Sequence, residues 1–466
     1  IEYIVVENKQ RTQDTYILRM HRMAEYTQLS FSFASVSGKK VTADFSGEQV
    51  TSDAGVLLLR EVAERTGLFD RLANVIEDSR HPGYITHSLR DLLAQRIFQI
   101  ACGYEDALDA NALRIDPAFK VACGRLPSEE NLASQSTISR FENALTSKDL
   151  RRLGDALVDC FIASYQIPPE HLVLDLDDTE DATHGAQQLS LFNGYYDTFC
   201  FQPLVIFEGT SGKLITAILR PGKRPTGREI RAILKRVVAR IRTAWPTVAI
   251  VVRGDSHYAA PEVFSWCDAH HIRYIFGLTR NPALVKRMDA LSRLAQRRYE
   301  IFKTKDRCFT EFEYQARSWH RTLRIVGMAE MSELGLNTRF VVTNILELRP
   351  FIIYEVTYCG RGQMENYIKE LKLGLKCDRT SCHAFYANTF RLFLHSFAYS
   401  LLHAFRGSLL AGTDFANAQF DTIRLCFLKI GAAVREWKTR IQFRLPQSYP
   451  LKDLFARMYD RLALLM

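Results

Sequence analysis

The stretch His171–Asp177, which reads HLVLDLD, decides the fold class of this 466-residue chain. Leucine occupies every second position, so the leucines share one face of an extended strand, and Asp175 and Asp177 share the other. Two prolines at positions 168 and 169 precede the strand and mark a change from helical to alternating apolar periodicity. We therefore expect an α/β segment to begin at residue 168.

Further strands and helices follow this first strand in a recognisable order. Thr226 and Glu229 have the spacing of a capping box, and apolar residues then recur every three or four positions, which predicts a helix. Pro261 opens a second, shorter helix. The other strands are expected at Phe199–Phe207, Lys213–Leu219, Val248–Val252 and Tyr274–Gly277. The predicted order is β-β-β-α-β-α-β.

The segments on either side of this α/β part have different patterns of apolar residues. From Asp53 to about Tyr165 the apolar spacing is helical throughout, which predicts an all-helical N-terminal region. Residues 132–141 place small polar residues before a helix that bears Arg140, as in a helix-turn-helix or in an ordinary capped helix. A β-rich insertion is expected between about Arg297 and Leu346. Helices are expected over Ile352–Leu373 and Ala387–Phe405, followed by short strands and a final helix.

Composition restricts the possible classes of protein. Apolar residues make up 47% of the chain and charged residues 24%, which is typical of a folded globular protein. The net charge of +9 mildly favours a polyanionic partner. No stretch reaches the roughly 18 to 20 apolar residues of a membrane span. The start of the chain lacks the pattern of a secretory signal and the ten cysteines show no disulfide spacing, so we expect an intracellular protein without a membrane partner.

Acidic residues stand where a metal site is expected. Asp177 ends the first strand and Asp255 follows the fourth, and both strand ends lie where open sheets bind ligands. At about 100° per residue, Tyr358, Arg361, Glu365 and Lys372 share one helical face, with Lys369 on the same side. Such a face is suited to a carboxylate ligand for Mg²⁺ or Mn²⁺ between cations that hold phosphate. Taken singly, each acid also fits a turn or a solvated helix face.

The pattern Tyr358-x2-Arg361-x3-Glu365-x6-Lys372 resembles the Y-R-E-K signature of bacterial DDE insertion-sequence transposases. The whole resemblance covers about residues 25–466 and is to the group of transposases called IS-thirteen-eighty. Six further blocks carry it: residues 45–47, 52–55, 174–187, 219–222, 253–256 and 378–392.

The resemblance implies a ribonuclease H-like catalytic core preceded by a helical DNA-binding region. The expected division is an N-terminal extension (1–38), the DNA-binding region (39–167), the core in two parts (168–285 and 347–410) around a β-rich insertion (286–346), and a C-terminal region (411–466). It further implies that Asp177, Asp255 and Glu365 hold two Mg²⁺ or Mn²⁺ ions for DNA cleavage and strand transfer. Asp175 remains the alternative first ligand.

The same resemblance implies DNA partners and contacts. The residues expected to contact backbone phosphates are Tyr358, Arg361, Lys372 and Lys369. Arg140 is a candidate contact to the terminal inverted repeats. Trp319 of the insertion is a candidate for stacking on a flipped base, or else a buried core residue. We expect a homodimer that acts on transposon ends and target DNA in the bacterial cytoplasm, at the nucleoid. The alternatives are a ribonuclease H-like nuclease without strand transfer and a domesticated, catalytically inactive DNA-binding protein.

Overall fold

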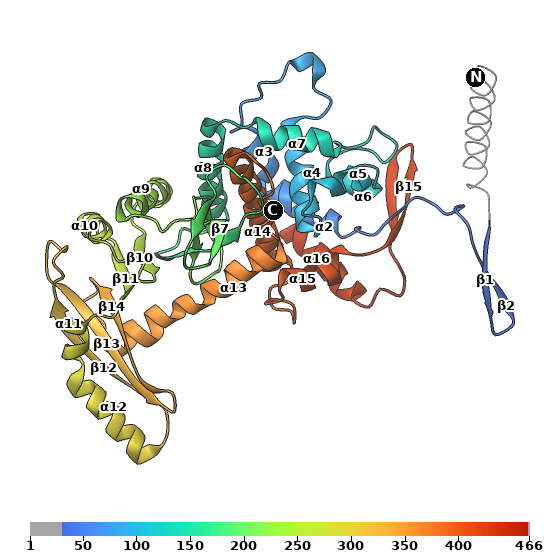
Figure 1. The fold of residues 1–466 in the computed structure, drawn as a ribbon. Helices are drawn as coiled ribbons and strands as arrows, with labels where there is room; N and C mark the ends of the chain where they lie inside the picture. The colour runs from blue at the N-terminus through green and yellow to red at the C-terminus, as the bar shows by residue number, and fades with distance from the viewer. Residues whose placement is uncertain (1–29, 465–466) are drawn as a thin grey trace, which may run out of the picture.

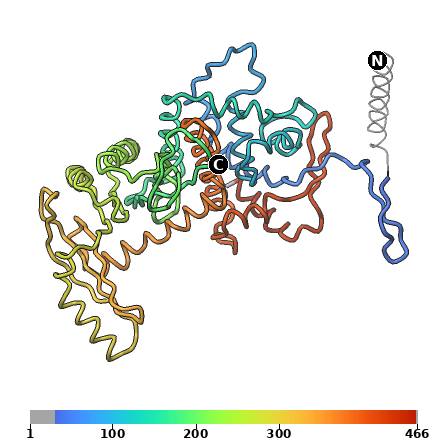
Figure 2. Tube along the Cα trace, viewed as in Figure 1, coloured from blue at the N-terminus to red at the C-terminus, as the bar shows by residue number. Residues whose placement is uncertain are grey.

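The computed structural model describes residues 30–464, so most of the predicted extension over residues 1–38 lies outside the described part. The described chain begins with a hairpin of β1 (Phe31–Val36) and β2 (Lys39–Ala43), which projects from the body of the molecule (Figures 1 and 2). A short strand, β3 (Val50–Thr51), then pairs with β15 (Ala432–Trp437) near the other end of the chain. The last part of the predicted extension therefore contains β1, the first strand of the hairpin.

Helices make up the described elements between Val56 and Ala163. Capping boxes of Ser88 with Asp91 and of Thr146 with Asp149 start two of them. The strands β2 and β3 precede Asp53, so they lie outside the stretch from Asp53 to about Tyr165 for which helical spacing is predicted. The helices are α2 (Val56–Thr66), α3 (Leu68–Ala73), η1 (Pro82–Tyr84), α4 (Leu89–Ala101), η2 (Ala107–Asp109), α5 (Ala110–Leu113), α6 (Pro117–Ala122), α7 (Gln135–Ala144) and α8 (Ser147–Ala163).

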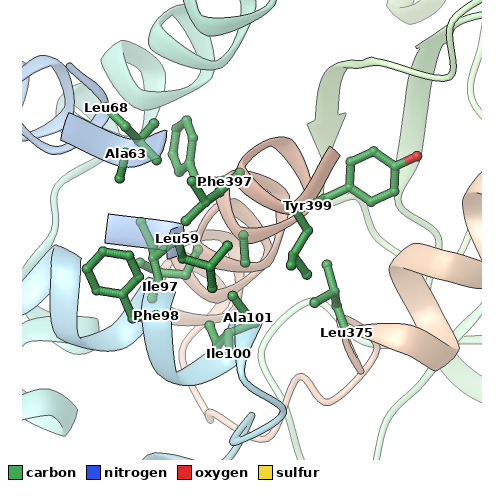
Figure 3. Close-up of a cluster of buried hydrophobic side chains, with 14 of the residues drawn as sticks. Leu59, Ala63, Leu68, Ile97, Phe98, Ile100, Ala101, Leu375, Phe397 and Tyr399 are labelled. Atoms are coloured by element: carbon green, nitrogen blue, oxygen red, sulfur yellow. The ribbon is translucent and has the colours of Figure 1, made fainter. Parts of the chain in front are cut away.

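A long apolar helix near the end of the chain, α14 (Phe385–Leu409), forms the centre of the largest hydrophobic core. Phe397 of α14 lies in this core with Leu59 of α2 and Phe98 of α4, whereas Tyr399 points away from these two residues (Figure 3). α14 thus joins the N-terminal helices to the second half of the chain. Neither α14 nor any other helix within residues 30–464 is both long and apolar enough to cross a membrane.

An eight-stranded sheet with the order β12-β13-β14-β11-β10-β4-β8-β9 forms the other half of the molecule. Its sixth strand in this order, β4 (His171–Asp178), runs parallel to β10 and antiparallel to β8. The predicted order β-β-β-α-β-α-β is found as β4, β8, β9, α9, β10, α10 and β11. Their bounds are β8 (Leu204–Glu208), β9 (Leu214–Ile218), α9 (Gly227–Ala244), β10 (Ala249–Gly254), α10 (Pro261–Ala269) and β11 (Arg273–Leu278).

Helices cover both faces of this sheet. The leucines of β4 pack with the apolar stripe of α9, and Thr226 and Glu229 form the predicted capping box of α9. On the opposite face, Phe207 of β8 packs with Tyr399 of α14. Because the aspartates of β4 alternate with its leucines, Asp175 and Asp177 face the side of α14 rather than that of α9.

The strand predicted over Phe199–Phe207 is in fact two strands in different sheets. β7 (Thr198–Phe201) lies in a three-stranded sheet with β5 (Asp181–Ala182) and β6 (Leu191–Asn193), whereas β8 lies in the large sheet. Pro203 stands between β7 and β8 and has no N–H to donate to a ladder, so it explains the break.

The β-rich insertion extends the large sheet instead of forming a separate unit. Its last strand, β14, pairs antiparallel with β11, and β13 and β12 continue outward from it. Two helices precede these strands, and α12 packs on the ladder. The bounds are α11 (Pro282–Arg287), α12 (Asp289–Phe302), β12 (Asp306–Tyr314), β13 (Leu323–Ser332) and β14 (Gly335–Thr343).

The helix predicted over Ile352–Leu373 is continuous but not a regular α-helix. It winds as a π-helix over η3 (Ile352–Tyr358), as a 3₁₀-helix over η4 (Cys359–Gly362), as an α-helix over α13 (Gln363–Lys369), and again as a π-helix over η5 (Glu370–Gly374). The angular argument at 100° per residue therefore does not describe this helix. The remaining elements are α15 (Phe420–Ile423), η6 (Arg424–Leu428), β16 (Arg440–Arg444) and α16 (Lys452–Leu464).

Replacing Phe397 with Ala is expected to destabilise the molecule by about 3 to 5 kcal/mol, because a fully buried ring of α14 leaves a cavity between the two halves. Thermal unfolding followed by circular dichroism measures the loss. Tyr386→Ala, at a half-exposed position of the same helix, is the matched control. Equal shifts of the two variants would show that α14 does not form the central core.

Candidate active site

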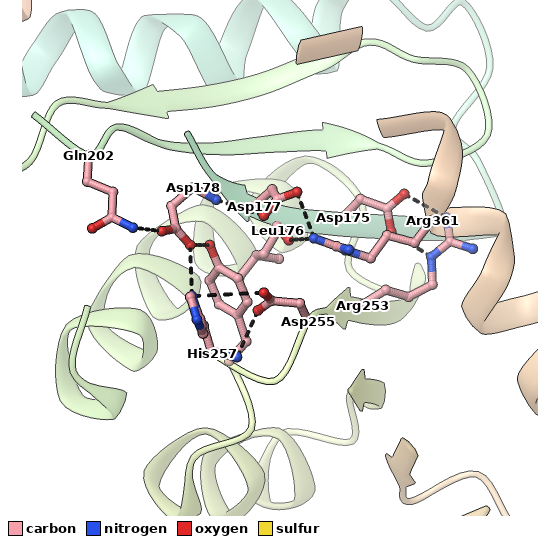
Figure 4. A network of polar contacts seen from close by, with 10 residues as sticks. Asp175, Leu176, Asp177, Asp178, Gln202, Arg253, Asp255, His257 and Arg361 are labelled. Atoms are coloured by element: carbon pink, nitrogen blue, oxygen red, sulfur yellow. Dashed lines mark hydrogen bonds and ion pairs between the residues drawn. The ribbon is translucent and has the colours of Figure 1, made fainter. Parts of the chain in front are cut away.

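Four aspartates lie close to one edge of the large sheet (Figure 4). Asp175, Asp177 and Asp178 belong to the end of β4, and Asp255 follows β10 directly. Because β4 and β10 are parallel neighbours, their carboxyl ends meet at the same edge. The sheet topology therefore gathers acids that are far apart along the chain.

Asp175 is held in a buried ion pair. Both of its oxygens accept from Arg253, Oδ1 from Nε and Oδ2 from Nη2, each at 2.6 Å. The two residues stand opposite each other on β4 and β10, and Asp175 is fully buried. Arg253 also donates through Nη1 to the carbonyl of Thr357 in η3. Asp175 thus fixes the position of the helix that carries Arg361 and is not free to bind another cation.

Two glycines leave the space that this ion pair needs. A Cβ atom at Gly209 would lie 2.4 Å from both Arg253 Nη2 and Asp175 Oδ2. A Cβ atom at Gly360 would lie 3.0 Å from Arg253 Nη1. The guanidinium is therefore enclosed by backbone on the side of β8 and on the side of η4.

Asp177 points to the same side and pairs with Arg361. The distance from Asp177 Oδ2 to Arg361 Nη2 is 2.7 Å, and only 19% of the Asp177 side chain is exposed. Burial raises the pKa of Asp177 to about 6 although Arg361 opposes the shift, and the nearby Asp255 and Asp178 raise it further. Asp177 is therefore a carboxylate with two other acids nearby and one guanidinium paired with it.

Asp178 faces the other side of β4, where polar groups surround it. Tyr258 donates its hydroxyl to Asp178 Oδ1 at 2.9 Å, and the amide of Gln202 donates to Oδ2. Burial and the neighbouring acids raise the pKa of Tyr258 well above its ordinary value, so it remains a donor. Asp178 is thus held as a hydrogen-bond acceptor.

His257 stands between two of the acids and was not identified from the sequence. Its Nδ1 lies 3.7 Å from Asp178 Oδ1 and 3.9 Å from Asp255 Oδ2, and its backbone N–H donates to Asp255 Oδ1 at 2.8 Å. Nδ1 is buried and has no hydrogen-bond partner within residues 30–464. Its place two residues after Asp255 is the only signal in the sequence.

The predicted helical residues are spread along the edge of the sheet. Tyr358 lies against Gly277 at the end of β11, where a Cβ atom would be 2.7 Å from its hydroxyl. Lys372 donates to the carbonyl of Glu180, and its Nζ lies 3.9 Å from Asp378 Oδ2. Lys369 is exposed. Arg361 is thus the member of the predicted set that contacts a predicted acid.

Glu365 does not join the aspartates. Its side chain is exposed, one turn beyond Arg361, and the described residues make no hydrogen bond or ion pair with it. In the part of the chain that the structure covers, no three acidic, histidine or cysteine side chains form a group that could hold a metal ion. The structure brings Asp177 and Asp255 together and leaves the third predicted carboxylate in solvent.

The other two predicted contact residues have different surroundings. Trp319 is only 8% exposed and packs edge-on against Phe264 and Tyr314, so it is a core residue, and stacking on a flipped base is excluded in this arrangement. Arg140 is exposed on α7 and donates to Thr137. Residues 123–134 separate α6 from α7. This connection is too long for the turn of a helix-turn-helix.

The donor set fits a divalent cation in part. Carboxylate oxygens such as those of Asp177 and Asp255 are the ligands that Mg²⁺ and Mn²⁺ prefer. Burial raises the pKa of Asp177, the nearby Asp255 and Asp178 raise it further, and the guanidinium of Arg361 is the cation paired with it. Asp177 and Asp255 lie near each other, whereas Glu365 lies apart from them.

The sequence and the fold both have matches among known proteins. Residues 33–466 match the protein family described as Transposase DDE domain group 1. Among solved structures, the chain is similar to a piggyBac transposase in a synaptic complex with hairpin DNA, at 9% sequence identity and a TM-score of 0.40. That similarity covers 90% of this chain and 88% of the other. No curated protein matches the sequence.

Replacing Arg253 with Met is expected to destabilise the protein by about 3 to 5 kcal/mol, because Asp175 would stay buried without its cation. The double variant Asp175→Leu/Arg253→Met removes both charges and should recover most of this loss. Chemical denaturation measures the free energy of unfolding of the parent, of Arg253→Met and of the double variant. Arg435→Met, which breaks the exposed pair with Glu48, is the control and should cost less than about 1 kcal/mol. A double variant no more stable than Arg253→Met would contradict the burial argument.

A second buried acid, Asp181 of β5, gives a prediction on pH. Burial raises its pKa to about 8 although Thr380 donates to Oδ2 at 3.0 Å and Lys372 is near, and Asp378 adds to the rise. Between about pH 4 and pH 8 the native protein keeps a proton that the unfolded chain releases. Stability should therefore fall as the pH rises through this window.

The variant Asp181→Asn has no such proton and should gain stability over the parent by up to about 1.4 kcal/mol per pH unit across the window. Denaturation midpoints at several pH values measure the difference. Asp460→Asn, at an exposed position of α16, should leave the pH dependence unchanged. Parallel curves for Asp181→Asn and the parent would show that Asp181 is ionised in the native state.

Proposed function

The chain belongs to the DDE transposase domain family, group 1, and from this membership we propose that it is an insertion-sequence transposase that cleaves DNA and joins the cut ends to a target. The observation that carries the proposal is the meeting of Asp177 and Asp255 at the carboxyl ends of β4 and β10, beside Arg361. DDE enzymes need converging carboxylates at such a place to hold divalent ions against DNA.

We further propose a ribonuclease H-like core and membership of the IS-thirteen-eighty group. The strand order β9-β8-β4-β10-β11, antiparallel on one side of β4 and parallel on the other, supports the core. The spacing of Tyr358, Arg361, Glu365 and Lys372 supports the group. The core is proposed to act with the N-terminal helical region, in which Arg140 is a candidate contact to the terminal inverted repeats.

The proposed ligands of two Mg²⁺ or Mn²⁺ ions are Asp177, Asp255 and Glu365. Asp175 is set aside as the first ligand because both of its oxygens are bound by Arg253. Divalent ions in such a site supply Lewis acidity for phosphoryl transfer. Glu365 is exposed on α13 and is proposed to turn toward Asp177 when the site is loaded.

Arg361 is proposed to leave Asp177 and pair with a DNA phosphate when DNA binds. Its Nη2 neutralises Asp177, while its Nε is buried and lacks a hydrogen-bond partner within the described residues. Phosphate oxygens offer a guanidinium paired acceptors of the same geometry as a carboxylate. Tyr358, Lys369 and Lys372 are proposed to contact neighbouring phosphates, with His257 available to orient or accept a proton near Asp255.

The proposed setting is the bacterial cytoplasm, where a homodimer would hold two transposon ends. The exposed position of Glu365 favours one alternative, a catalytically inactive DNA-binding descendant in which the third acid never reaches the site. Cleavage assays separate the two functions directly.

Replacing Asp177 or Asp255 with Asn, or Glu365 with Gln, should reduce cleavage of DNA carrying the inverted repeats to background, because each change removes a charged ligand. Binding of the same DNA should persist within about threefold, since phosphate contacts by Arg and Lys dominate affinity. One gel with labelled DNA and Mg²⁺ or Mn²⁺ reads nicks and joined products. Glu300→Gln, at an exposed position of α12, is the control.

Pre-cut ends distinguish a transposase from a nuclease. Joining of a pre-cut 3′ end to a plasmid by the parent protein would support strand transfer, and cutting without joining would favour the nuclease. Full cleavage by Glu365→Gln would remove Glu365 from the proposed ligands.

A further inference from the structure

An exposed aromatic hairpin lies next to the candidate active site. We define it as residues 191–199, which comprise β6, the turn and the start of β7. Phe192 and Phe199 face each other across the two strands with ring centroids 5.5 Å apart, and they are 54% and 57% exposed. At the turn, Tyr195 is 85% exposed and contacts Tyr196. Aromatic side chains grouped in solvent usually mark an interaction site.

The chain connects this hairpin to the acids at both of its ends. Three residues after Asp178, Asp181 pairs with Phe201 in the small sheet that includes the hairpin. Gln202, the residue after β7, donates its side-chain amide to Asp178. Burial raises the pKa of Tyr196, and the acids Asp178 and Asp177 raise it further. The aromatic rings therefore border the catalytic edge of the sheet.

A neighbouring loop brings cations to the same place. Asn193 of the hairpin donates to the carbonyl of Gly222 at 3.1 Å, and a Cβ atom at Gly222 would lie 2.3 Å from the carbonyl oxygen of Cys200. The loop therefore packs tightly on the hairpin. Its exposed residues Lys223 and Arg224 follow, and Arg224 donates to the carbonyl of Ser256, the residue after Asp255.

The segment that leads into the hairpin is fixed to the rest of the protein. Gln187 donates to the carbonyl of Thr380 at 2.7 Å, and His383 Nδ1 lies 2.7 Å from the carbonyl of Ala186. The backbone N–H of Gln188 donates to the carbonyl of His383. The aromatic rings are thus presented by an anchored element, which reduces the entropy lost when a ligand binds.

We propose that the aromatic hairpin binds unpaired bases of the DNA strand next to the scissile phosphate, and this inference rests on the proposed transposase function. Phe192 and Tyr195 provide faces on which bases stack, and Lys223 and Arg224 contact the phosphates between them. Aromatic rings beside cations are the combination that binds single strands without regard to sequence. A second copy of the chain is the other candidate occupant, but it does not account for cations placed between the rings and the acids.

The test measures binding of the full-length protein to two fluorescein-labelled DNAs by anisotropy. One is a blunt duplex and the other is the same duplex with an unpaired thymidine tail. The parent should bind the tailed DNA more tightly. The double variant Phe192→Ala/Tyr195→Ala should lose about tenfold or more of the affinity for tailed DNA, while blunt-duplex binding stays unchanged. Tyr195→Phe keeps the ring and should behave as the parent.

Two controls keep this result specific. Tyr84→Ala removes a tyrosine that is equally exposed in the N-terminal helical region and should change neither affinity. Lys223→Ala/Arg224→Ala should weaken binding of the tailed DNA and make it less dependent on salt. Circular dichroism of each variant verifies the fold.

Three outcomes would overturn the inference. Equal affinity of the parent for both DNAs would remove the aromatic hairpin as a base-binding surface and leave the proposed function intact. Retained preference for the tail in the alanine variant would do the same. A change from dimer to monomer in that variant, seen by sedimentation with the tail preference intact, would assign the rings to a second copy. Absence of any DNA binding by the parent would instead contradict the transposase proposal itself.

Discussion

The crowding of carboxylates at the end of β4 is the constraint on which the rest of the structure depends. Asp175 and Asp177 share a face of one strand, and each must be neutralised in a partly dry environment. Arg253, from the parallel neighbour β10, neutralises the first, and Arg361, from the helix that crosses the sheet, neutralises the second. Because Arg253 also binds the carbonyl of Thr357, the same charge that satisfies Asp175 determines where that helix lies.

The hydrophobic core supports this arrangement from the other side. α14 packs on helices from the first third of the chain and on β8 and β9, so the region predicted to bind DNA shares its core with the half that contains the large sheet. A boundary near residue 168 therefore marks a change in secondary structure and not a gap in packing. Burial is the largest cause of the raised pKa of both Asp177 and Asp181.

Local patterns predicted much of the fold. Alternation in β4, the capping box of α9 and the order of strands and helices all follow from near neighbours in the sequence. What the sequence could not supply was contact between distant segments: that Asp175 is paired with Arg253, that Trp319 is buried, and that His257 lies between two acids. The angular position of Glu365 could not be predicted for a further reason, since the spacing of 100° per residue holds for a regular α-helix and this helix changes its pitch three times.

The pairing of β14 with β11 has a consequence for how the insertion relates to the rest of the enzyme. Residues 282–343 are inserted in sequence, yet in space they complete the hydrogen bonding of the strand next to the one that ends at Asp255. Excising them would leave the backbone of β11 as a bare edge, open to pairing with other chains. The segment therefore cannot be removed without exposing β11. Homologous proteins with a shorter version would need another strand or a helix to shield that edge.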